Sequence, residues 1–323
     1  MDVGGSHVTA GLVECSDTAR VMPGSTLRTP ADEGWPAPAL LDAWATTGSD
    51  CARRFGSRAD DLDSNGADRS GLDLHGVDPD VRNAPRHIGA VGIAMPAPFD
   101  YGAGISTMRH KFAALSGRNV GQGLRSRWNA DASLGGLLIR FGNDGDLWAL
   151  GEARFGAAAG ARRVIGVTIG TGLGSGFVAE GVVQRDGPGV PTDAELWCTP
   201  FDGATAEDLA SGRSLVRSYV HRSSAPLAQS DASIDGQEIA RRARDGDPNA
   251  RGAFDELGRS LGRVLRPWSD VFEADIVVVG GSVAKAWDLF AAPLAEALTG
   301  VRVVCTQLFE DATLLGAAAM CHG

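Results

Sequence analysis

A glycine-rich turn between two apolar segments constrains the fold of this chain more than any other feature of its sequence. Residues 164–169 form an apolar run typical of a strand, and Phe177 and Val178 resume that pattern. Glycine occupies every second position from Gly170 to Gly176, so backbone amides there can approach an anion closely. Neither the Lys-Ser/Thr pair of a phosphate loop nor the helix of a dinucleotide fingerprint follows. The segment indicates a β-hairpin that holds phosphate, with a plain hairpin turn as the alternative.

Composition limits the class of protein. A chain of 323 residues has room for two domains and a large core. The net charge of −10 argues against nucleic acid as the main partner, and the apolar runs are too short to span a membrane. Five scattered cysteines without a CxxC pair predict neither a disulfide framework nor a zinc knuckle. We expect a cytoplasmic protein.

The first residues suggest a second anion-binding turn. Asp2 precedes a turn made by Gly4, Gly5 and Ser6, and an apolar strand follows. A carboxylate beside such amides suits hydrated Mg²⁺ next to phosphate oxygens, whereas a plain β-turn is the alternative. Only Met1 precedes Asp2, although strands usually have about five or six residues. We therefore expect that the chain lacks most of its first strand and that restoring it would raise stability and activity.

Two intermediate segments are less informative. Residues 56–87 carry seven aspartates and few large apolar side chains, which predicts an exposed insertion after a helix at 37–55. The aspartates lack the spacing of a calcium loop. His110 and Lys111 could touch a substrate, but placement on the surface is favoured for both.

Polar residues at the ends of predicted strands are candidate site residues. Asn143 and Asp144 lie between a strand predicted at 137–141 and a helix, where a side chain has rigid support; helix capping is the alternative. Glu195 and Glu207 are acceptors suited to sugar hydroxyls, although exposed glutamates are common.

A third glycine-rich segment follows the strand predicted at 275–279. Gly280, Gly281 and Ser282 come directly after its apolar residues, and a helix is expected next. Glycine at this point allows the close approach of a flat ring such as adenine.

Taken together, these segments resemble the ROK family of sugar kinases, in the actin-like ATPase superfamily. Residues 2–6 look like its first phosphate motif, with Ser6 for the usual threonine, and 170–174 like its second. Residues 143–152 are similar to the catalytic segment, 278–282 to the adenosine motif and 207–212 to the end of the zinc region. The match covers nearly the whole chain in the family's order.

The resemblance implies an α/β, two-domain actin-like ATPase (ribonuclease H-like) fold with an interdomain cleft. The small domain would comprise residues 1–118, completed by a C-terminal helix at 308–323, and the larger domain residues 119–307. A homodimer is a candidate assembly.

The resemblance also assigns roles to the candidate residues. Asp144 would be the general base, with Asn143, Glu195 and Glu207 beside it as sugar ligands, and Asp2 would lie near Mg²⁺. The ATP and phosphate contacts would come from the three glycine-rich segments, at Asp2, Gly4, Gly5, Ser6, Gly170, Thr171, Gly172, Gly174, Gly280, Gly281 and Ser282.

The chain departs from the family's pattern around its zinc region. The usual Gly-Glu-Leu-Gly-His is replaced by residues 194–198, Ala-Glu-Leu-Trp-Cys, and the cysteine-rich loop is missing. Cys198 alone cannot build a zinc site of about four ligands. We expect no zinc, with Trp197 and Phe201 packing in its place.

These observations favour an ATP-dependent kinase acting on a hexose or related sugar. The alternative is a non-catalytic sugar-binding or sensing protein that keeps the kinase fold. Repressors of the family carry an N-terminal helix-turn-helix, for which we expect no room before residue 2. A third reading is an actin-like ATPase with a protein client, against which the carboxylates at 144, 195 and 207 favour a small polyol.

Overall fold

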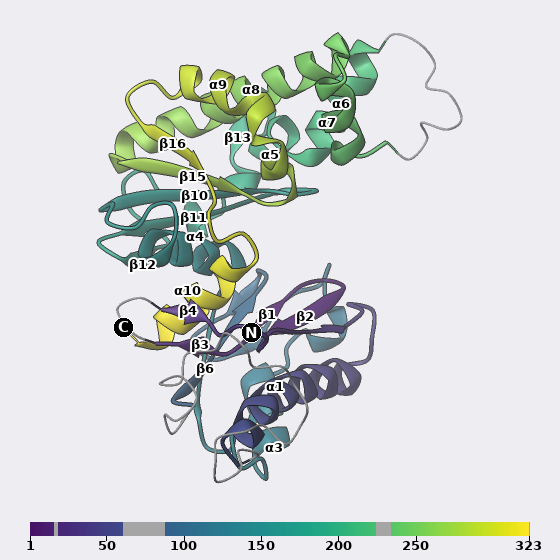
Figure 1. Cartoon of the computed structure of the whole chain (residues 1–323), viewed down its shortest axis with the longest axis vertical. Coiled ribbons are helices and arrows are strands. Elements are labelled where there is room, and N and C mark those ends of the chain that lie inside the picture. Colours follow the sequence, from purple (N-terminus) through teal and green to yellow (C-terminus); the bar gives the residue numbers. More distant parts are fainter. Residues whose placement is uncertain (16–18, 61–87, 224–233, 323) are drawn as a thin grey trace. The chain divides into compact units, whose positions relative to one another are not determined.

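The computed structural model describes residues 1–15, 19–60, 88–223 and 234–322. The insertion expected at 56–87 lies outside them from residue 61 on. The chain forms two compact units, which are treated separately below (Figure 1). Unit 1 contains residues 1–144 and 317–323, and unit 2 contains residues 145–316. The boundary expected from the sequence, between residues 118 and 119, remains a proposal about domains.

Unit 1 is built on a five-stranded sheet in the order β5-β2-β1-β6-β9. Strand β1 is central, antiparallel to β2 and parallel to β6. The strands of this sheet are β1 (Asp2–Val3), β2 (His7–Ala10), β5 (Leu27–Pro30), β6 (Ala90–Met95) and β9 (Leu138–Asn143). Two short hairpins accompany it, made by β3 (Val13–Glu14) with β4 (Arg20–Val21) and by β7 (Phe99–Asp100) with β8 (Ile105–Ser106).

Helices cover this sheet and bury their apolar residues in the same core as residues of its strands. Helix α1 (Ala37–Asp60) buries Leu40 and Trp44, one turn apart, and extends past the end expected at residue 55. The Trp44 ring meets Phe112, from the 3₁₀ turn region η1 (Ala113–Leu115), edge-on at 5.3 Å. Helix α3 (Val120–Trp128) starts where the Asn119 side chain accepts the Gln122 amide at 2.7 Å.

Unit 2 has a second five-stranded sheet, in the order β12-β11-β10-β15-β16. Strand β10 pairs antiparallel with β11 over seven positions and parallel with β15. The strands are β10 (Arg163–Ile169), β11 (Leu173–Ala179), β12 (Val182–Gln184), β15 (Ile276–Gly280) and β16 (Arg302–Cys305). Every residue of β15 is buried, as expected for a parallel strand covered on both faces.

Helices pack on both faces of this sheet (Figure 1). On one face α4 comes close, because a Cβ at Gly166 would lie 2.6 Å from the Ala149 side chain. On the other face Phe177 packs in a core that includes residues of α8 and α9. The helices of this unit are α4 (Asp144–Phe155), α5 (Ala206–Leu209), α6 (Gly212–Arg222), α7 (Gly236–Arg244), α8 (Pro248–Phe272), α9 (Trp287–Ala297) and the start of α10 (Asp311–His322).

Short elements connect these helices and strands. They are the 3₁₀ turns η2 (Thr192–Ala194), η3 (Leu196–Cys198) and η5 (Ser282–Ala286), and a small hairpin of β13 (Pro200–Phe201) and β14 (Ala204–Thr205). In the described part of the chain, no helix combines the length and apolar character needed to cross a membrane.

Candidate functional site

The glycine-rich segment of unit 2 forms the tip of the β10–β11 hairpin. Helix α6 anchors the tip from one side, because the Gly212 amide donates to the Gly170 carbonyl at 2.9 Å. The Arg213 amide donates to the Thr171 carbonyl at 3.4 Å. Within the described residues, the amides of Thr171 and Gly172 donate to no protein acceptor. Because the carbonyls of this turn are hydrogen-bonded to α6 and two of its amides are available, the turn is suited to bind an anion.

Glu207, on α5, forms a second anchor for this hairpin. Its Oε2 accepts the Leu173 amide at 2.9 Å, and its Oε1 accepts Nη2 of Arg213. A Cβ at position 172 would lie 2.3 Å from Oε2 of Glu207, so any larger residue there would have to displace this carboxylate. The carboxylate expected to hold sugar is therefore already engaged with the phosphate hairpin.

A cavity of about 820 Å³ opens beside this hairpin, inside unit 2. Its walls come from the hairpin, α6, α7, α8 and η5. The apolar part is lined by Val216, Ile234, Ala240, Phe254, Val283 and Ala286. The cations on its wall are Arg213, Arg217, Arg244 and Lys285. An apolar recess beside cations and bare amides fits a nucleotide better than a sugar alone.

The adenosine motif contributes mainly to the packing behind this cavity. Ser282 lines it, whereas Gly280 faces the Trp148 ring, which a Cβ would approach to 2.2 Å. Gly281 has φ of 84°, and a Cβ there would lie 2.4 Å from the Ile169 carbonyl. Both glycines thus also make close protein contacts, and the approach of a flat ring at Gly280, Gly281 and Ser282 remains a prediction.

In unit 1, the turn between β1 and β2 is anchored in a similar way. The Gly5 carbonyl accepts the Glu33 amide at 3.2 Å, and the Ser6 carbonyl accepts the Ala31 amide at 3.0 Å. The Gly4 amide donates to the His7 carbonyl at 2.9 Å. In residues 1–15 and the rest of the described chain, the amides of Gly5 and Ser6 donate to no protein acceptor.

Asp2 lies at the start of β1 in the same turn region. It is half-buried and pairs with Thr9 on β2 and Ala94 on β6. A carboxylate carried by a paired strand next to a turn with available amides suits a hydrated divalent cation beside phosphate.

Asn143 and Asp144 occupy the junction predicted for them. Strand β9 ends at Asn143 and α4 begins at Asp144. Nδ2 of Asn143 donates to the Tyr101 hydroxyl at 3.2 Å, and that hydroxyl donates to the Met95 carbonyl at 3.3 Å. This chain of bonds orients the Asn143 amide. Sequence reasoning missed Tyr101, which directly follows the two-residue strand β7.

Glu195 lies in a strained segment held by a buried serine. Asp193 and Ala194 both have positive φ, 57° and 60°. Oγ of Ser175, on β11, donates to the Ala194 carbonyl at 2.6 Å and accepts the Leu196 amide at 3.0 Å. Sequence reasoning overlooked Ser175 because it lies among the glycines of the hairpin.

The expected aromatic brace is wrong for Trp197. Its side chain is 45% exposed, and Nε1 donates to Oε2 of Glu195 at 3.2 Å. Phe201 does pack against the core of unit 2, with the Arg263 guanidinium over its ring. The segment is held by the hydrogen bonds to Ser175, and the exposed indole does not brace it.

Glu152, part of the catalytic segment by resemblance, is a structural residue. It is fully buried, and its Oε2 accepts the Ala157 amide at 2.8 Å. Its Oε1 accepts the Leu308 amide at 3.1 Å and the Thr306 hydroxyl. The carboxylate thereby fixes the segment that leads into α10.

No described group of three or more His, Cys, Asp or Glu side chains is arranged to hold a metal ion. Partial burial, with the nearby Glu195 carboxylate, raises the pKa of the Cys198 thiol. Absence of zinc remains a prediction from the sequence.

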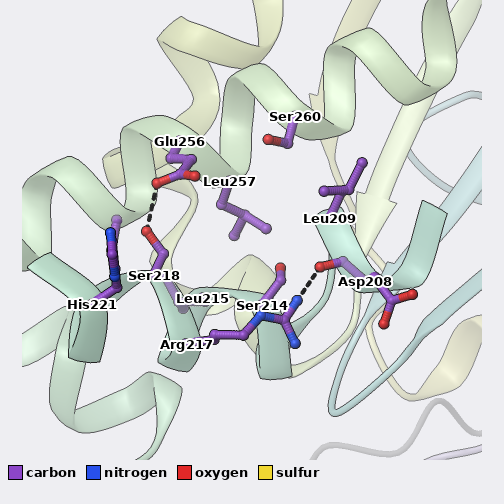
Figure 2. Close-up of a pocket in the computed structure, with 11 residues that line it drawn as sticks. Asp208, Leu209, Ser214, Leu215, Arg217, Ser218, His221, Glu256, Leu257 and Ser260 are labelled. Atoms are coloured by element: carbon purple, nitrogen blue, oxygen red, sulfur yellow. Dashed lines mark hydrogen bonds between the residues drawn. The ribbon is translucent and has the colours of Figure 1, made fainter. Parts of the chain in front are cut away.

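A second cavity, of about 220 Å³, lies between α5, α6 and α8 (Figure 2). The Ser218 hydroxyl donates to Oε2 of Glu256 at 2.6 Å, and Arg217 donates to the Asp208 carbonyl. These polar groups are thus engaged with one another. Arg217 also lines the larger cavity, so the two cavities adjoin along α6.

Comparison with known proteins gives the chain a family. A model of the ROK family matches residues 77–323. The chain belongs to the ROK family. The glucokinase of Streptomyces coelicolor is 32% identical over 211 aligned positions, covering 57% of this chain and 67% of that protein. These findings establish a relationship to sugar kinases.

Other relatives define the fold and the range of functions. A solved ROK family glucokinase from Streptomyces griseus, in complex with glucose and AMPPNP, matches with TM-score 0.68 at 25% identity, covering 100% of this chain and 98% of that one. This ROK chain therefore has the actin-like ATPase fold. The DNA-binding transcriptional repressor Mlc of Escherichia coli is 25% identical, covering 57% of this chain and 50% of that protein.

Proposed function

We propose that this ROK protein transfers the terminal phosphoryl group of ATP to a hydroxyl of a hexose or related sugar. The observation that carries the proposal is the unit 2 hairpin: within the described chain, it presents two amides without protein acceptors beside a cavity lined by apolar side chains and cations. The glucokinase relatives support the same reaction class.

Each unit has a part in this proposal. In unit 2, the amides of Thr171 and Gly172 would bind donor phosphates, and the apolar wall would take the nucleoside. In unit 1, Asp2 would help to hold Mg²⁺, which neutralises charge on the phosphates when bound. Pre-oriented amides stabilise the charge that develops during transfer because they need no reorganisation.

Sugar recognition and proton transfer fall to the remaining polar residues. We propose that Asp144 accepts the proton of the attacking hydroxyl as general base, which contributes typically about 10²–10⁴-fold in rate. Asn143, Glu195 and Glu207 would bind other hydroxyls and reject analogues that leave these groups unpaired.

The main test is the Asp144→Asn variant. Asparagine keeps the size of the side chain and cannot accept the proton, so we expect kcat to fall by about 10²–10⁴-fold while sugar affinity is retained. ADP release is measured across hexoses, amino sugars and polyols. Asp42→Asn, an exposed carboxylate paired with Arg127, is the control and should keep wild-type turnover.

Two outcomes would reject the proposal. If no sugar in the panel raises ADP release, the protein is not a sugar kinase, and the sensing function, which the similarity to Mlc supports, becomes the preferred one. If Asp144→Asn retains wild-type turnover, Asp144 is not the base. Sugar binding without turnover in the wild-type protein would identify a sensor directly.

A further inference from the structure

Glu207 connects the phosphate hairpin to an arginine of the larger cavity. Each of its two carboxylate oxygens accepts a different hydrogen bond. Oε2 accepts one from the Leu173 amide, and Oε1 accepts one from Nη2 of Arg213. Arg213 lines the cavity next to Thr171. Under the proposed function, the same carboxylate is also a sugar ligand, so donor phosphate would bind one member of this ion pair and sugar the other.

The ion pair is placed so that phosphate can exchange with the carboxylate. The Arg213 side chain is 58% exposed and that of Glu207 is 22% exposed. Water screens such a pair, which therefore contributes little to stability. A guanidinium binds phosphate through paired, charge-assisted hydrogen bonds, and these are stronger. The Arg213 amide already bonds to the Thr171 carbonyl, which keeps its side chain beside the hairpin tip.

The other arginines of the cavity have partners outside the hairpin. Arg244 donates to both carboxylate oxygens of Asp288. Arg217, one turn after Arg213 on α6, donates to the Asp208 carbonyl (Figure 2). Arg213 differs from both because its partner is a candidate substrate ligand.

We propose that Arg213 couples donor binding to sugar binding. Without donor, Arg213 holds Oε1 of Glu207. When donor phosphate takes the guanidinium, Oε1 is released to accept a sugar hydroxyl, while Oε2 keeps the Leu173 amide and the hairpin geometry. Because linkage is reciprocal, bound sugar raises donor affinity by the same factor. The proposal rests on the proposed function and makes Arg213 a positioning residue for Glu207.

Calorimetric titration tests this coupling. AMPPNP with Mg²⁺ is titrated into the full chain with and without the sugar that gives the fastest ADP release, and the sugar is titrated with and without AMPPNP. In the wild-type protein each ligand should raise the affinity of the other by about 5–50-fold. In Arg213→Ala the factor should fall close to 1, donor affinity should drop about tenfold, and sugar affinity without donor should not decrease.

Matched variants separate coupling from a structural effect. Arg222→Ala removes an arginine of the same helix that pairs with Glu256 and does not line the larger cavity, so coupling should remain. Arg213→Lys keeps the charge and should retain part of the donor affinity. Glu207→Gln can still accept the Leu173 amide and releases Arg213, so it should bind donor at least as tightly as the wild-type protein.

The proposal is overturned if Arg213→Ala keeps the wild-type coupling factor, or if the wild-type protein phosphorylates a sugar without any coupling. The AMPPNP titration alone is also decisive: unchanged donor affinity in Arg213→Ala contradicts the proposal whether or not a sugar substrate is found. Lack of ADP release with every sugar rejects the proposed function instead.

Discussion

In the glycine-rich turns of unit 1 and unit 2, carbonyls accept backbone amides from a neighbouring segment. The two turns differ in the length of the strands that they join. In unit 1 the turn joins β1, of two residues, to β2, of four. In unit 2 it joins β10 and β11, each of seven residues. The first turn is anchored by the backbone of residues 31–33, whose Glu33 side chain is exposed, and the second by helix α6 and a half-buried carboxylate.

This difference bears on which turn is pre-organised for an anion. A turn fixed by long paired strands and packed glycines needs little ordering when it binds, and this lowers the cost of binding. A turn on short strands is ordered by fewer contacts and can adjust more easily. The seven paired positions of β10 and β11, with the contacts from Glu207 and α6, therefore pre-organise the unit 2 hairpin for an anion.

The largest expected effect on stability is at Gly281, behind the unit 2 hairpin. In Gly281→Ala the new Cβ would meet the Ile169 carbonyl at 2.4 Å at a φ of 84°. Left-handed backbone and a collision with backbone together should lower the free energy of unfolding by about 2–4 kcal/mol. Urea denaturation measures the change.

Gly300→Ala is the matched control for that variant. Gly300 has φ of 94°, and a Cβ added there would meet none of the described atoms within 4 Å, so only backbone strain of about 1–2 kcal/mol is expected. Equal losses in the two variants would show that packing against Ile169 does not stabilise the hairpin, and the inferred difference between the turns would be wrong.

A serine in each hairpin region gives the next comparison. Ser175→Ala removes the buried hydroxyl that bonds to the Ala194 carbonyl and the Leu196 amide, leaving two buried groups without a partner. We expect a loss of about 1–3 kcal/mol in unfolding free energy. Ser6→Ala removes an exposed hydroxyl near His7 and should change it by less than about 0.5 kcal/mol. Comparable losses in Ser175→Ala and Ser6→Ala would contradict the conclusion that the unit 2 hairpin is held more firmly than the unit 1 turn.

The smallest effect concerns α7, which lines the larger cavity. Hydrogen bonds from Arg241 and Arg242 lower the pKa of Glu238 from 4.5 to about 2. Since the folded pKa is the lower one, the stabilisation is complete above pH 4.5 and is lost as pH falls toward 2. Wild-type protein should exceed Glu238→Gln in urea midpoint at about pH 6, by a small amount, and the gap should close near pH 2. A gap that stays constant with pH would show that these bonds are not the cause.

The sequence alone predicted both turns and the strand-to-helix junction at Asn143 and Asp144. Glycine spacing, apolar runs and helix patterns are properties of short windows, so they predicted β10, β11 and the boundary between Asn143 and Asp144. The helix expected at 37–55 ends later in the structure, at Asp60, because a sequence pattern locates the last turn of a helix poorly.

The tertiary structure decided which groups meet. Glu207 and Leu173 are 34 positions apart, and Ser175 and Leu196 are 21 apart. No local pattern encodes such pairs, because they form only when α5, α6 and the 194–198 segment pack against the hairpin. The sequence therefore determined where an anion-binding turn could form, whereas long-range packing determined that Glu207 and Arg213 hold it, since hydrogen-bond partners are chosen by distance in the folded chain.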